Sequence, residues 1–291
     1  MPTKDRNLPS VAARRENEVI MFDCGEGTQK QMVLSRIGFN KKMKIFITHM
    51  HGDHVLGLPG MLQSMSLLGR SKELDVYGPQ GIGDFVESVN RTVQFQLVFP
   101  LRIHEIGPST ALNEPYYEIK VVRANHVIPC LSYALVEKPK PGRFNPKKAQ
   151  ALGVPKGPLW KKLQLGEDVK IGGRIVKSSD VVGSPRAGVK LVYAVDTRPC
   201  SAVRRLASNA DLLIHDGSFD DSMRDKAKEY GHSTASEAAN LARQAKVKQL
   251  VLTHISAMYN NPRVLLRQAR KIHRRAAIAS DLMVIDVKAS N

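Results

Sequence analysis

Side chains that bind metal ions are concentrated in one short stretch, HMHGDH at residues 49–54. It follows an apolar segment, Lys44–Thr48, that we expect to be a β-strand. His49 and His51 are two positions apart and can point the same way in an extended chain. The glycine that follows lets the chain turn and aim Asp53 and His54 at a second point. Imidazole and carboxylate groups together suit zinc or a similar divalent ion, so one turn could supply two adjacent ions.

Three further metal-binding candidates also follow expected strands. These are His126 after Tyr117–Arg123, Asp196 directly after Lys190–Val195, and His254 after Gln249–Thr253. Ligands in open α/β sheets collect at the carboxyl ends of strands, so these groups and the HMHGDH turn could converge on one rim. Asp196 would be a natural bridge, because a carboxylate has two oxygens. Taken singly, Asp196 could cap the next turn and His126 could be a core histidine, but the joint pattern favours two metals.

The elements that would position these groups are short apolar runs and helix-like stretches. The expected strands are Glu18–Phe22, Lys44–Thr48, Leu74–Tyr77, Tyr117–Arg123, Ser132–Val136, Lys190–Val195, Asp211–His215, Gln249–Thr253 and Leu282–Val287. The expected helices are Thr28–Ile37, Gly57–Ser66, Gly81–Asn90, Thr234–Ala245 and Pro262–Ser280. Strands come both as neighbouring pairs and separated by helices, which predicts an α/β protein with mixed strand directions.

The composition favours a globular protein with a polyanionic partner. The chain has 291 residues, of which 42% are hydrophobic, enough to bury a sizeable core. Its 44 Lys and Arg outnumber 27 Asp and Glu, which gives a net charge of +17. A surface this positive suits nucleic acid. Many basic proteins instead bind membranes or carry lysine for solubility, so the charge alone does not identify the partner.

Cysteine usage and the apolar runs bear on the compartment. Cys24, Cys130 and Cys200 have no regular spacing and form no CxxC pair, which argues against a disulfide framework and favours a reducing compartment. The polar start, MPTKDRNLPS, has no signal-peptide character, and no apolar run approaches the length of a membrane span. We therefore expect a soluble, cytoplasmic protein with no membrane association.

One segment differs from the rest in composition. Residues 138–166 contain five prolines, eight Lys or Arg, no acidic residue and the only tryptophan, Trp160. A segment this rich in Pro and Lys would bury little apolar surface, so we expect it to leave the core. A solvated linker is the simpler interpretation. Because residues 138–166 lie between two candidate metal ligands in the sequence, an inserted arm that binds substrate is the second interpretation.

Several motifs together resemble the ribonuclease Z family of the metallo-β-lactamase fold. HMHGDH fits the HxHxDH signature of that fold, which alone identifies only the superfamily. The narrower resemblance lies in PTKDRN at residues 2–7, FDCGEGTQKQ at 22–31, HGDHVLGLPG at 51–60, DTRPC at 196–200, GHST at 231–234 and LTHIS at 252–256. It implies an αββα sandwich of two mixed sheets, with residues 1–291 as a single domain and 138–166 as an inserted basic tRNA-binding arm.

The resemblance also implies a role for each site residue. His49, His51 and His126 would hold one Zn²⁺, Asp53, His54 and His254 would hold the other, and Asp196 would bridge the two. Asp53 would orient the attacking water or accept its proton, and His232, in GHST, would assist the leaving oxygen. His232 could otherwise be a neighbour of a helix cap, since Ser233 and Thr234 can open the next helix. The implied reaction cleaves the 3′ trailer from precursor tRNA, leaving a tRNA 3′-hydroxyl and a 5′-phosphate on the trailer.

The resemblance further implies how the substrate is held. In this family an arm inserted in this region grips tRNA, and GVPKGPL at residues 153–159 resembles the tip of that arm. Phosphate contacts from Lys and Arg supply affinity without sequence readout, which suits an enzyme that processes many tRNAs. Family members are generally homodimers, which implies that one subunit's arm presents tRNA to the active site of the other.

Two other polar features lie outside the ligand set. The basic residues Arg263, Arg267, Lys271 and Arg275 recur every four positions along the expected last helix, either as a solvated face or as a tRNA contact. His215 and Asp216 occupy a place where many relatives carry a His-Glu motif, and we expect Asp216 to orient a metal-ligating imidazole. His104 and His273 fall in no motif and are expected to be surface or structural.

The resemblance is incomplete at the start, and two other functions fit part of the pattern. The family opens with a strand and a Gly-rich turn before the PTKDRN-like loop, so we expect that first strand to be missing. A zinc phosphodiesterase or other hydrolase of the same fold acting on small substrates would not need the basic arm. A non-catalytic RNA-binding module would not need a metal pair.

Overall fold

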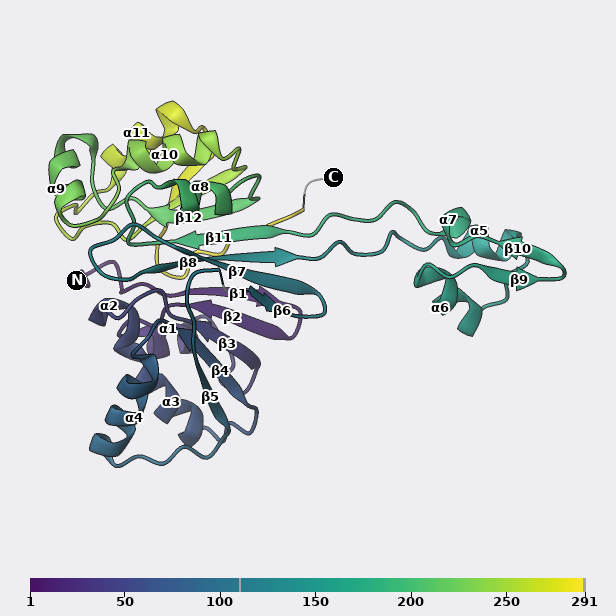
Figure 1. Ribbon diagram of the computed structural model, residues 1–291, viewed down its shortest axis with the longest axis horizontal. Helices are drawn as coiled ribbons and strands as arrows, with labels where there is room; N and C mark the ends of the chain where they lie inside the picture. The colour runs from purple at the N-terminus through teal and green to yellow at the C-terminus, as the bar shows by residue number, and fades with distance from the viewer. Residues whose placement is uncertain (110, 290–291) are drawn as a thin grey trace.

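The computed structural model describes residues 1–109 and 111–289, whose strands form two large sheets (Figure 1). The first sheet has the order β1-β2-β3-β4-β5. Its strands are β1 (Val11–Arg15), β2 (Glu18–Phe22), β3 (Lys42–Phe46), β4 (Leu74–Gly78) and β5 (Leu101–Glu105). β1 is antiparallel to β2, and the others run parallel to their neighbours, so the sheet is mixed.

The second sheet is also mixed and has the order β14-β13-β12-β11-β8-β7-β6. Its strands are β6 (Ala111–Asn113), β7 (Tyr117–Arg123), β8 (Leu131–Glu137), β11 (Lys190–Ala194), β12 (Leu212–Asp216), β13 (Gln249–Thr253) and β14 (Ala276–Ile278). β11 to β14 are parallel, whereas β8 is antiparallel to both of its neighbours. Parallel neighbours bring the carboxyl ends of β11, β12 and β13 to the same rim.

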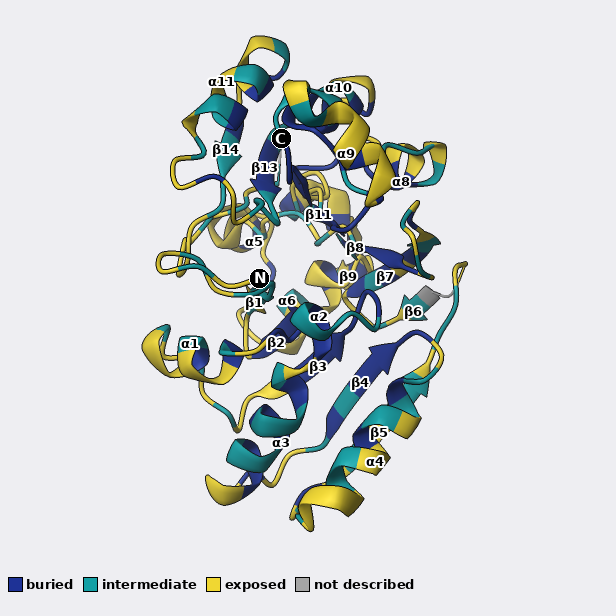
Figure 2. Ribbon diagram, turned by 90° about the vertical axis from the view of Figure 1, so that its left-hand side faces the viewer, coloured by how far each residue is buried: buried dark blue, intermediate teal, exposed yellow. Residues whose placement is uncertain are grey.

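Aromatic side chains fill the space between the two sheets. The ring centroid of Phe22 lies 5.4 Å from that of Tyr193, and Phe46 lies 5.4 Å from Tyr133. In β2, Ile20 and Phe22 face this inter-sheet core, while Val19 and Met21 face the helices on the outer side. This period-two alternation follows from strand geometry. In Figure 2 the strands of both sheets, such as β13 and β3, are largely dark blue, the colour of buried residues.

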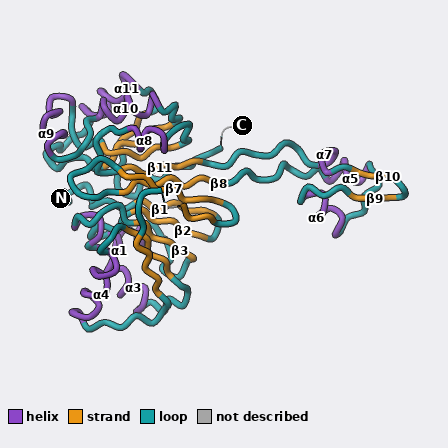
Figure 3. Tube along the Cα trace, viewed as in Figure 1, coloured by secondary structure: helices purple, strands orange, loops and turns teal. Residues whose placement is uncertain are grey.

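Helices cover the outer faces of both sheets (Figure 3). The first sheet carries α1 (Thr28–Leu34), α2 (Gly52–Val55), α3 (Gly57–Leu67) and α4 (Ile82–Val93). The second carries α8 (Ser201–Leu206), the 3₁₀ turn η1 (Asp221–Met223), α9 (Arg224–Glu229), α10 (Ala235–Gln244) and α11 (Arg263–Ile272). Thr234 and Glu237 form a capping box that starts α10. The layers are therefore helix, sheet, sheet and helix, which confirms the predicted αββα sandwich.

The C-terminal region departs from the expected elements. The helix expected over Pro262–Ser280 ends at Ile272, and β14 follows it instead, paired in parallel with β13. Arg275 therefore lies outside the helix, so the four-residue basic stripe does not continue on one helical face. The strand expected over Leu282–Val287 is absent from this described stretch. Ile285 and Val287 instead pack on the inter-sheet core without joining the ladder.

A long segment leaves the second sheet after Glu137 and returns at Lys190, longer than residues 138–166, the stretch singled out by composition. Figure 1 shows it projecting far from the body. It contains α5 (Pro146–Ala151), α6 (Pro158–Gln164), β9 (Val169–Ile171), β10 (Arg174–Val176) and α7 (Ser178–Val181). We call residues 138–189 the arm.

The far end of the arm has a small core of its own, contrary to the expectation that the segment buries little apolar surface. Val154, Leu163 and Val169 are buried there. Trp160 packs against this cluster and donates from its indole Nε1 to the Val154 carbonyl at 3.1 Å. Two extended connections, bridged between Lys140 and Arg186, join this end to the body. The distal part is thus a folded knob on a two-stranded stalk.

Candidate metal centre and active site

The HMHGDH turn lies at the carboxyl end of β3. The chain stays extended past Phe46 to His49 and turns into the short helix α2 at Gly52. The loop after β2 packs directly on this turn, since a Cβ added at Gly25 would lie 2.3 Å from the Asp53 carbonyl oxygen. The Cys24 backbone N–H also donates to the His54 carbonyl at 2.8 Å. These contacts leave room only for glycine and fix the turn against the sheet.

The other candidate ligands lie at strand ends of the second sheet. Asp196 and His254 follow β11 and β13, and each has a left-handed backbone, with φ of 51° and 57°. His126 comes from the loop that joins β7 to β8. Non-glycine residues in this backbone region are uncommon and cost of order 1–3 kcal/mol, and such strain clusters at functional sites. The strain here accompanies a sharp turn at the end of each strand.

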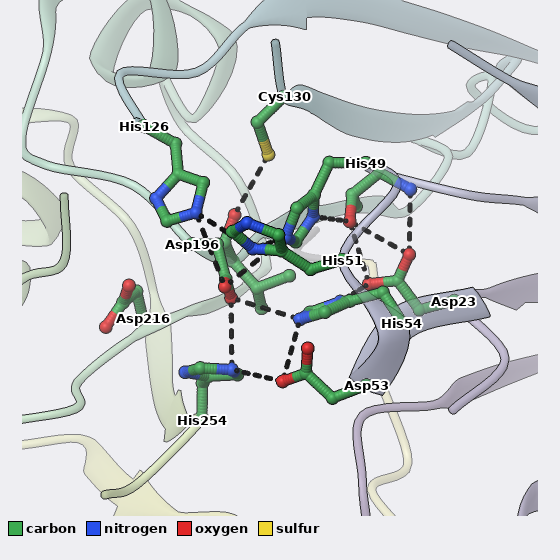
Figure 4. Close-up of polar contacts among 12 residues, drawn as sticks. Asp23, His49, His51, Asp53, His54, His126, Cys130, Asp196, Asp216 and His254 are labelled. Atoms are coloured by element: carbon green, nitrogen blue, oxygen red, sulfur yellow. Dashed lines mark hydrogen bonds and ion pairs between the residues drawn. The ribbon is translucent and has the colours of Figure 1, made fainter. Parts of the chain in front are cut away.

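One group of ligand atoms forms on the side of His51. One ligand atom from each of His49, His51, His126 and Asp196 lies within 4.8 Å of the others. The His49 Nε2 atom is 3.0 Å from His51 Nδ1, and His126 Nε2 is 3.4 Å from the same atom. Figure 4 shows the three rings pointing toward one another.

A second group forms on the side of Asp53. Ligand atoms of Asp53, His54 and His254 again lie within 4.8 Å of one another. The carboxylate of Asp196 lies between the two groups: its Oδ2 is 3.5 Å from His49 Nε2, and its Oδ1 is 3.4 Å from His54 Nε2 and 3.3 Å from His254 Nε2 (Figure 4). The structure thus brings together all seven residues that the sequence singled out.

Hydrogen bonds on the outer side of several rings direct unprotonated nitrogens inward. His54 Nδ1 donates to Asp23 Oδ2 at 2.7 Å, and His126 Nδ1 donates to the Gly231 carbonyl at 3.0 Å. In a neutral imidazole, such a bond leaves a lone pair on Nε2. His54 Nε2 and Asp196 Oδ1 are buried and have no hydrogen-bond partner within the described chain. Lone pairs that face one another with no hydrogen atom between them repel, and a divalent cation bound between them would remove that repulsion. This set of imidazole and carboxylate ligands therefore fits metal ions.

Burial and neighbouring charges set the protonation of these groups. Burial, together with the neighbouring His54, lowers the pKa of His49 to about 2, so this ring is neutral. Burial would raise the pKa of Asp196, but His254 and His54 outweigh it and hold that pKa well below its ordinary value. Burial likewise opposes ionisation of Asp53, whose pKa is nevertheless lowered by a hydrogen bond from His254. Burial would lower the pKa of His54, but the Asp196 and Asp23 carboxylates outweigh it and raise that pKa, so a metal ion binding to His54 Nε2 would displace a proton.

His232 lies at the edge of this cluster. Its ring centroid is 5.0 Å from that of His254 and 5.2 Å from that of His126. Its Nδ1 donates to Asp216 Oδ2 at 2.7 Å. Burial lowers the pKa of His232, but this bond and the charge of Asp216 outweigh burial, so the pKa is raised. Asp216 was expected to orient a metal-ligating imidazole, and the imidazole that it orients is that of His232, which is not one of the seven predicted ligands. Ligand atoms of Asp216 and His232 do lie within 4.8 Å of those of Asp196 and His254.

The sequence did not single out Asp23 as a functional residue. It follows β2, is fully buried, and accepts bonds from His54 Nδ1 and from the Tyr193 hydroxyl at 2.9 Å. Its other oxygen accepts from the Thr48 backbone N–H at 2.7 Å. The signal that could have found it is the one that found Asp196, an acidic residue placed directly after an apolar strand.

The remaining histidines lie away from the cluster. His104 pairs with Asp75 at 2.9 Å and stacks on Tyr77 in the first sheet. His273 donates from Nε2 to the Val247 carbonyl at 2.9 Å. His215 is buried and donates from Nδ1 to the Asp216 carbonyl at 2.8 Å. All three have structural partners.

Two mixed sheets between helix layers, with a His and Asp cluster at their common rim, define a metallo-β-lactamase-fold protein. A family model described as a beta-lactamase superfamily domain matches residues 18–151 and 177–255, and the unmatched stretch between them lies in the arm. Within the described residues, no helix has the length and apolar character needed to cross a membrane.

Relatives of known sequence and structure narrow this class. Proteins named Ribonuclease Z from Methanosarcina acetivorans and Methanothermobacter thermautotrophicus are 45% and 47% identical to this chain, over 99% of it and 94% of each relative. The crystal structure of human tRNase Z, short form, superposes with a TM-score of 0.71 at 30% identity, covering 99% of this chain and 95% of that one. The chain belongs to the ribonuclease Z family and is a ribonuclease, a hydrolase of phosphodiester bonds.

Proposed function

We propose that this ribonuclease is a two-zinc endonuclease that removes the 3′ trailer from precursor tRNA, leaving a 3′-hydroxyl on the tRNA and a 5′-phosphate on the trailer. The observation that carries the proposal is the convergence of seven His and Asp side chains on one rim, in a chain of the ribonuclease Z family. The name of the human structural relative, tRNase Z, supports tRNA as the substrate.

Each metal would have its own set of ligands. His49, His51 and His126 would hold one ion, and Asp53, His54 and His254 the other, with Asp196 shared. Imidazole and carboxylate donors in this proportion suit zinc. Bound metal ions would polarise the scissile phosphate and make water acidic enough to supply hydroxide near neutral pH. Buried carboxylates and hydrogen-bonded rings keep the ligands oriented before substrate binds.

Asp53 is the residue that we assign to the attacking water. It differs from Asp196 in exposure: its side chain is 26% exposed, whereas that of Asp196 is 3% exposed. Its Oδ2 lies 3.2 Å from His254 Nε2 at the open side of the cluster, so both atoms can approach the same metal ion. An ionised carboxylate in this position can orient a water molecule and accept its proton.

His232 is the residue that we assign to the leaving oxygen. Breaking the bond between phosphorus and the tRNA 3′ oxygen produces an alkoxide, a poor leaving group unless it receives a proton. The Asp216 carboxylate fixes the His232 ring and favours its protonated form. The ring is partly exposed, with 14% of its side chain accessible, so it can reach bound substrate. General acid catalysis of this kind contributes typically 10²–10⁴-fold.

The arm would bind the RNA away from the cleavage site. Lys147, Lys148, Lys156, Lys161 and Lys162 are all exposed on its knob and its connecting loops. Such residues bind phosphates without reading sequence. The arm is attached at the C-terminal end of β8 and the N-terminal end of β11, whereas the opposite ends of these two strands lead to the metal-binding cluster. Strands of this length place the base of the arm about 20 Å from the cluster. An arm directed away from its own site can serve the site of a second copy, which supports a homodimer. The proposed activity on precursor tRNA implies a cytoplasmic protein.

The test is cleavage of a 3′-extended precursor tRNA by the purified protein. We expect cutting at the 3′ end of the mature tRNA that stops with a chelator, resumes when Zn²⁺ is restored, and is lost in Asp53→Ala. The same preparations are assayed for RNA binding and for hydrolysis of a small diester, bis(p-nitrophenyl) phosphate. Hydrolysis of the diester without any cleavage of precursor tRNA would contradict the proposed substrate, and RNA binding without hydrolysis of either would contradict the enzyme.

A further inference from the structure

A cavity of about 470 Å³ opens on the His126 side of the metal-binding cluster. Its lining includes Asn125, Val127, Pro199 and Lys228, with the His126 ring as one wall. We call it the His126 cavity. Its volume falls within the range of about 300–1,000 Å³ that is typical of ligand sites.

The loops that carry the candidate site residues also build this cavity. The Arg198 backbone N–H donates to the Asn125 carbonyl at 2.7 Å, and Asn125 N–H donates to Thr197 Oγ1 at 3.1 Å. These bonds tie the loop of His126 to the loop of Asp196. The cavity therefore has a fixed position relative to the candidate ligands.

The opposite wall is fixed to the loop that carries His232. The Arg198 guanidinium donates to the His232 carbonyl at 2.7 Å and makes two bonds to the Glu237 carboxylate, at 2.7 and 2.6 Å. Gly231, with φ of +73°, also lines the cavity, and a Cβ there would lie 2.8 Å from His126 Nδ1. The backbone of the His232 loop can approach His126 this closely only because residue 231 is glycine.

We propose that the His126 cavity is the subsite for the last nucleoside of the mature tRNA, the one whose 3′ oxygen leaves. This inference rests on the proposed function. The oxygen that leaves must lie beside His232, and the nucleoside attached to it must occupy adjacent space. The cavity provides that space, because its wall residue His126 has its ring centroid 5.2 Å from that of His232.

In-line displacement excludes the attacking side as the place for this nucleoside. The attacking and leaving oxygens lie on opposite sides of phosphorus. Asp53, which we assign to the attacking water, does not line the cavity, whereas Gly231, the neighbour of His232, does. The trailer stays bonded to phosphorus through its 5′ oxygen, off this axis. The cavity thus corresponds to the leaving side.

The lining suits a base of any identity with a phosphate beside it. Val127 is 59% exposed and, with Pro199, offers an apolar surface to one face of a base. The planar guanidinium of Arg198 can stack on a base, as arginine does in many RNA-binding sites. Lys228, exposed on α9, is placed to bind the phosphate on the 5′ side of that nucleoside. Stacking tolerates sequence changes because every base has a π face.

The test combines enzyme variants that fill the cavity with RNA substrates that lack a single base. Val127→Trp and the smaller change Val127→Phe fill the cavity. Each is assayed on three substrates: an intact precursor tRNA, the same RNA with an abasic ribose at the last tRNA nucleotide, and one with an abasic ribose at the first trailer nucleotide. Bis(p-nitrophenyl) phosphate reports on the chemistry alone. Lys226→Ala, on the same helix as Lys228 but outside the cavity lining, is the matched control for Lys228→Ala.

We expect the abasic ribose at the last tRNA nucleotide to lower kcat/KM of the unmodified enzyme about tenfold, as expected for one lost base contact. Val127→Trp or Val127→Phe should lower cleavage of intact RNA about tenfold more than diester hydrolysis, with little further loss on that abasic RNA. Lys228→Ala should weaken RNA binding more than Lys226→Ala does.

Two results would overturn this assignment without touching the proposed function. In one, precursor tRNA is still cleaved, but a cavity variant lowers kcat/KM by the same factor on the RNA with the abasic tRNA nucleotide as on intact RNA. In the other, the cavity variants are coupled to the abasic trailer nucleotide instead. Failure of the unmodified protein to cleave intact precursor tRNA, with the diester still hydrolysed, would instead overturn the proposed function, and the cavity assignment with it.

Discussion

The Asp23 carboxylate accepts a 2.7 Å hydrogen bond from His54 Nδ1, although the two residues are 31 positions apart. The same carboxylate accepts from the backbone N–H and the hydroxyl of Thr48, the residue that opens the HMHGDH turn. One buried acid at the end of β2 therefore orients one candidate ligand and fixes the backbone that carries several others.

Replacing Asp23 by Asn should weaken metal binding. An amide has one acceptor oxygen, and its NH₂ group would face His54 Nδ1 or Thr48, so at least one donor loses its partner. Loss of such an orienting group typically costs 10–100-fold in metal affinity. Chelator competition on the purified protein measures it. Tyr193→Phe is the matched control: it removes another donor to Asp23 but leaves the bond to His54, and its metal affinity should stay within about threefold of the starting value. Equal affinities for all three proteins would contradict the assigned role.

Asp216→Asn and His232→Ala should lower kcat without loss of metal. His232→Ala removes the proposed proton donor, and we expect a fall of about 10²–10⁴. Asp216→Asn keeps the ring but removes the charge that favours its protonated form, so its effect should be smaller and in the same direction. Single-turnover cleavage and metal content are measured together. His104→Ala removes another histidine paired with an aspartate, Asp75, outside the site, and should leave kcat unchanged. A normal single-turnover rate for His232→Ala would refute its role in protonating the leaving oxygen.

Much of the fold was readable from hydrophobic patterns, and the failures have physical causes. β2, β7 and β13 were predicted with their observed bounds, because β2 and β13 are apolar runs flanked by polar residues and β7 alternates apolar with charged side chains. β14 was mistaken for the end of a helix, because Ala276–Ile278 is short and alanine-rich and becomes a strand only by pairing with β13. β5, LRIHE, mixes charged and apolar residues and was missed for a similar reason. Tertiary pairing overrides local preference in such segments.

The candidate ligands were easier to predict than their supporting contacts. Residues such as Asp196 and His254 follow strands whose ends meet at one rim, so their convergence follows from strand order alone. The partner of Asp216 depends instead on how the loop of His232 crosses the end of β12, a path held by Arg198 and Glu237. No local pattern specifies contacts between loops that far apart in sequence.

Lys44→Met should destabilise the fold strongly. Lys44 is 5% exposed, and its ammonium lies 3.1 Å from Glu18 Oε1 and 3.2 Å from Glu114 Oε1. Removing it leaves the buried Glu18 carboxylate poorly compensated, which typically costs about 3–5 kcal/mol in free energy of unfolding. Lys42→Met is the matched control, because Lys42 contacts the same carboxylate at 3.3 Å from a side chain that is 60% exposed. An exposed pair of this kind contributes about 0–1 kcal/mol. Equal losses in denaturant unfolding would contradict the prediction.

The same lysine predicts how its contribution depends on pH. Burial alone would lower the pKa of Lys44, but the hydrogen bonds and charges of Glu18 and Glu114 outweigh it, so the pKa in the folded state is raised. A group whose pKa is raised on folding contributes its full stabilisation at any pH below its pKa in the unfolded chain. That contribution is lost as the pH rises through the pKa of the folded state. The difference in unfolding free energy between the starting protein and Lys44→Met should therefore be constant near neutral pH and shrink in strong alkali. If this difference in unfolding free energy grew in alkali, the folded-state pKa of Lys44 would be lowered and not raised, which would contradict the prediction.

Removing the arm should separate RNA binding from phosphodiester chemistry. The knob has its own core, and only the two connections bridged by Lys140 and Arg186 join it to the body. Replacing residues 141–185 by a two-residue Asn-Gly turn should thus leave the sandwich folded, since antiparallel connections accept such a turn. Hydrolysis of a small diester should persist, while affinity for precursor tRNA falls at least tenfold and becomes less dependent on salt. Each lost phosphate contact reduces the slope of log K against log salt by about 0.7–0.9.

A variant that lacks the lysine charges of the arm separates their contribution to tRNA affinity from that of the arm's shape. Lys147, Lys148, Lys161 and Lys162 are exposed on the knob, so changing all four to Gln should keep the small core intact. If phosphate contacts carry the binding, this variant should reproduce most of the loss in affinity and in salt slope seen on removing the arm. If it binds like the starting protein while the armless chain does not, the arm acts through its shape or through subunit association. Unchanged affinity and slope in both variants would mean that precursor tRNA is held by the body alone.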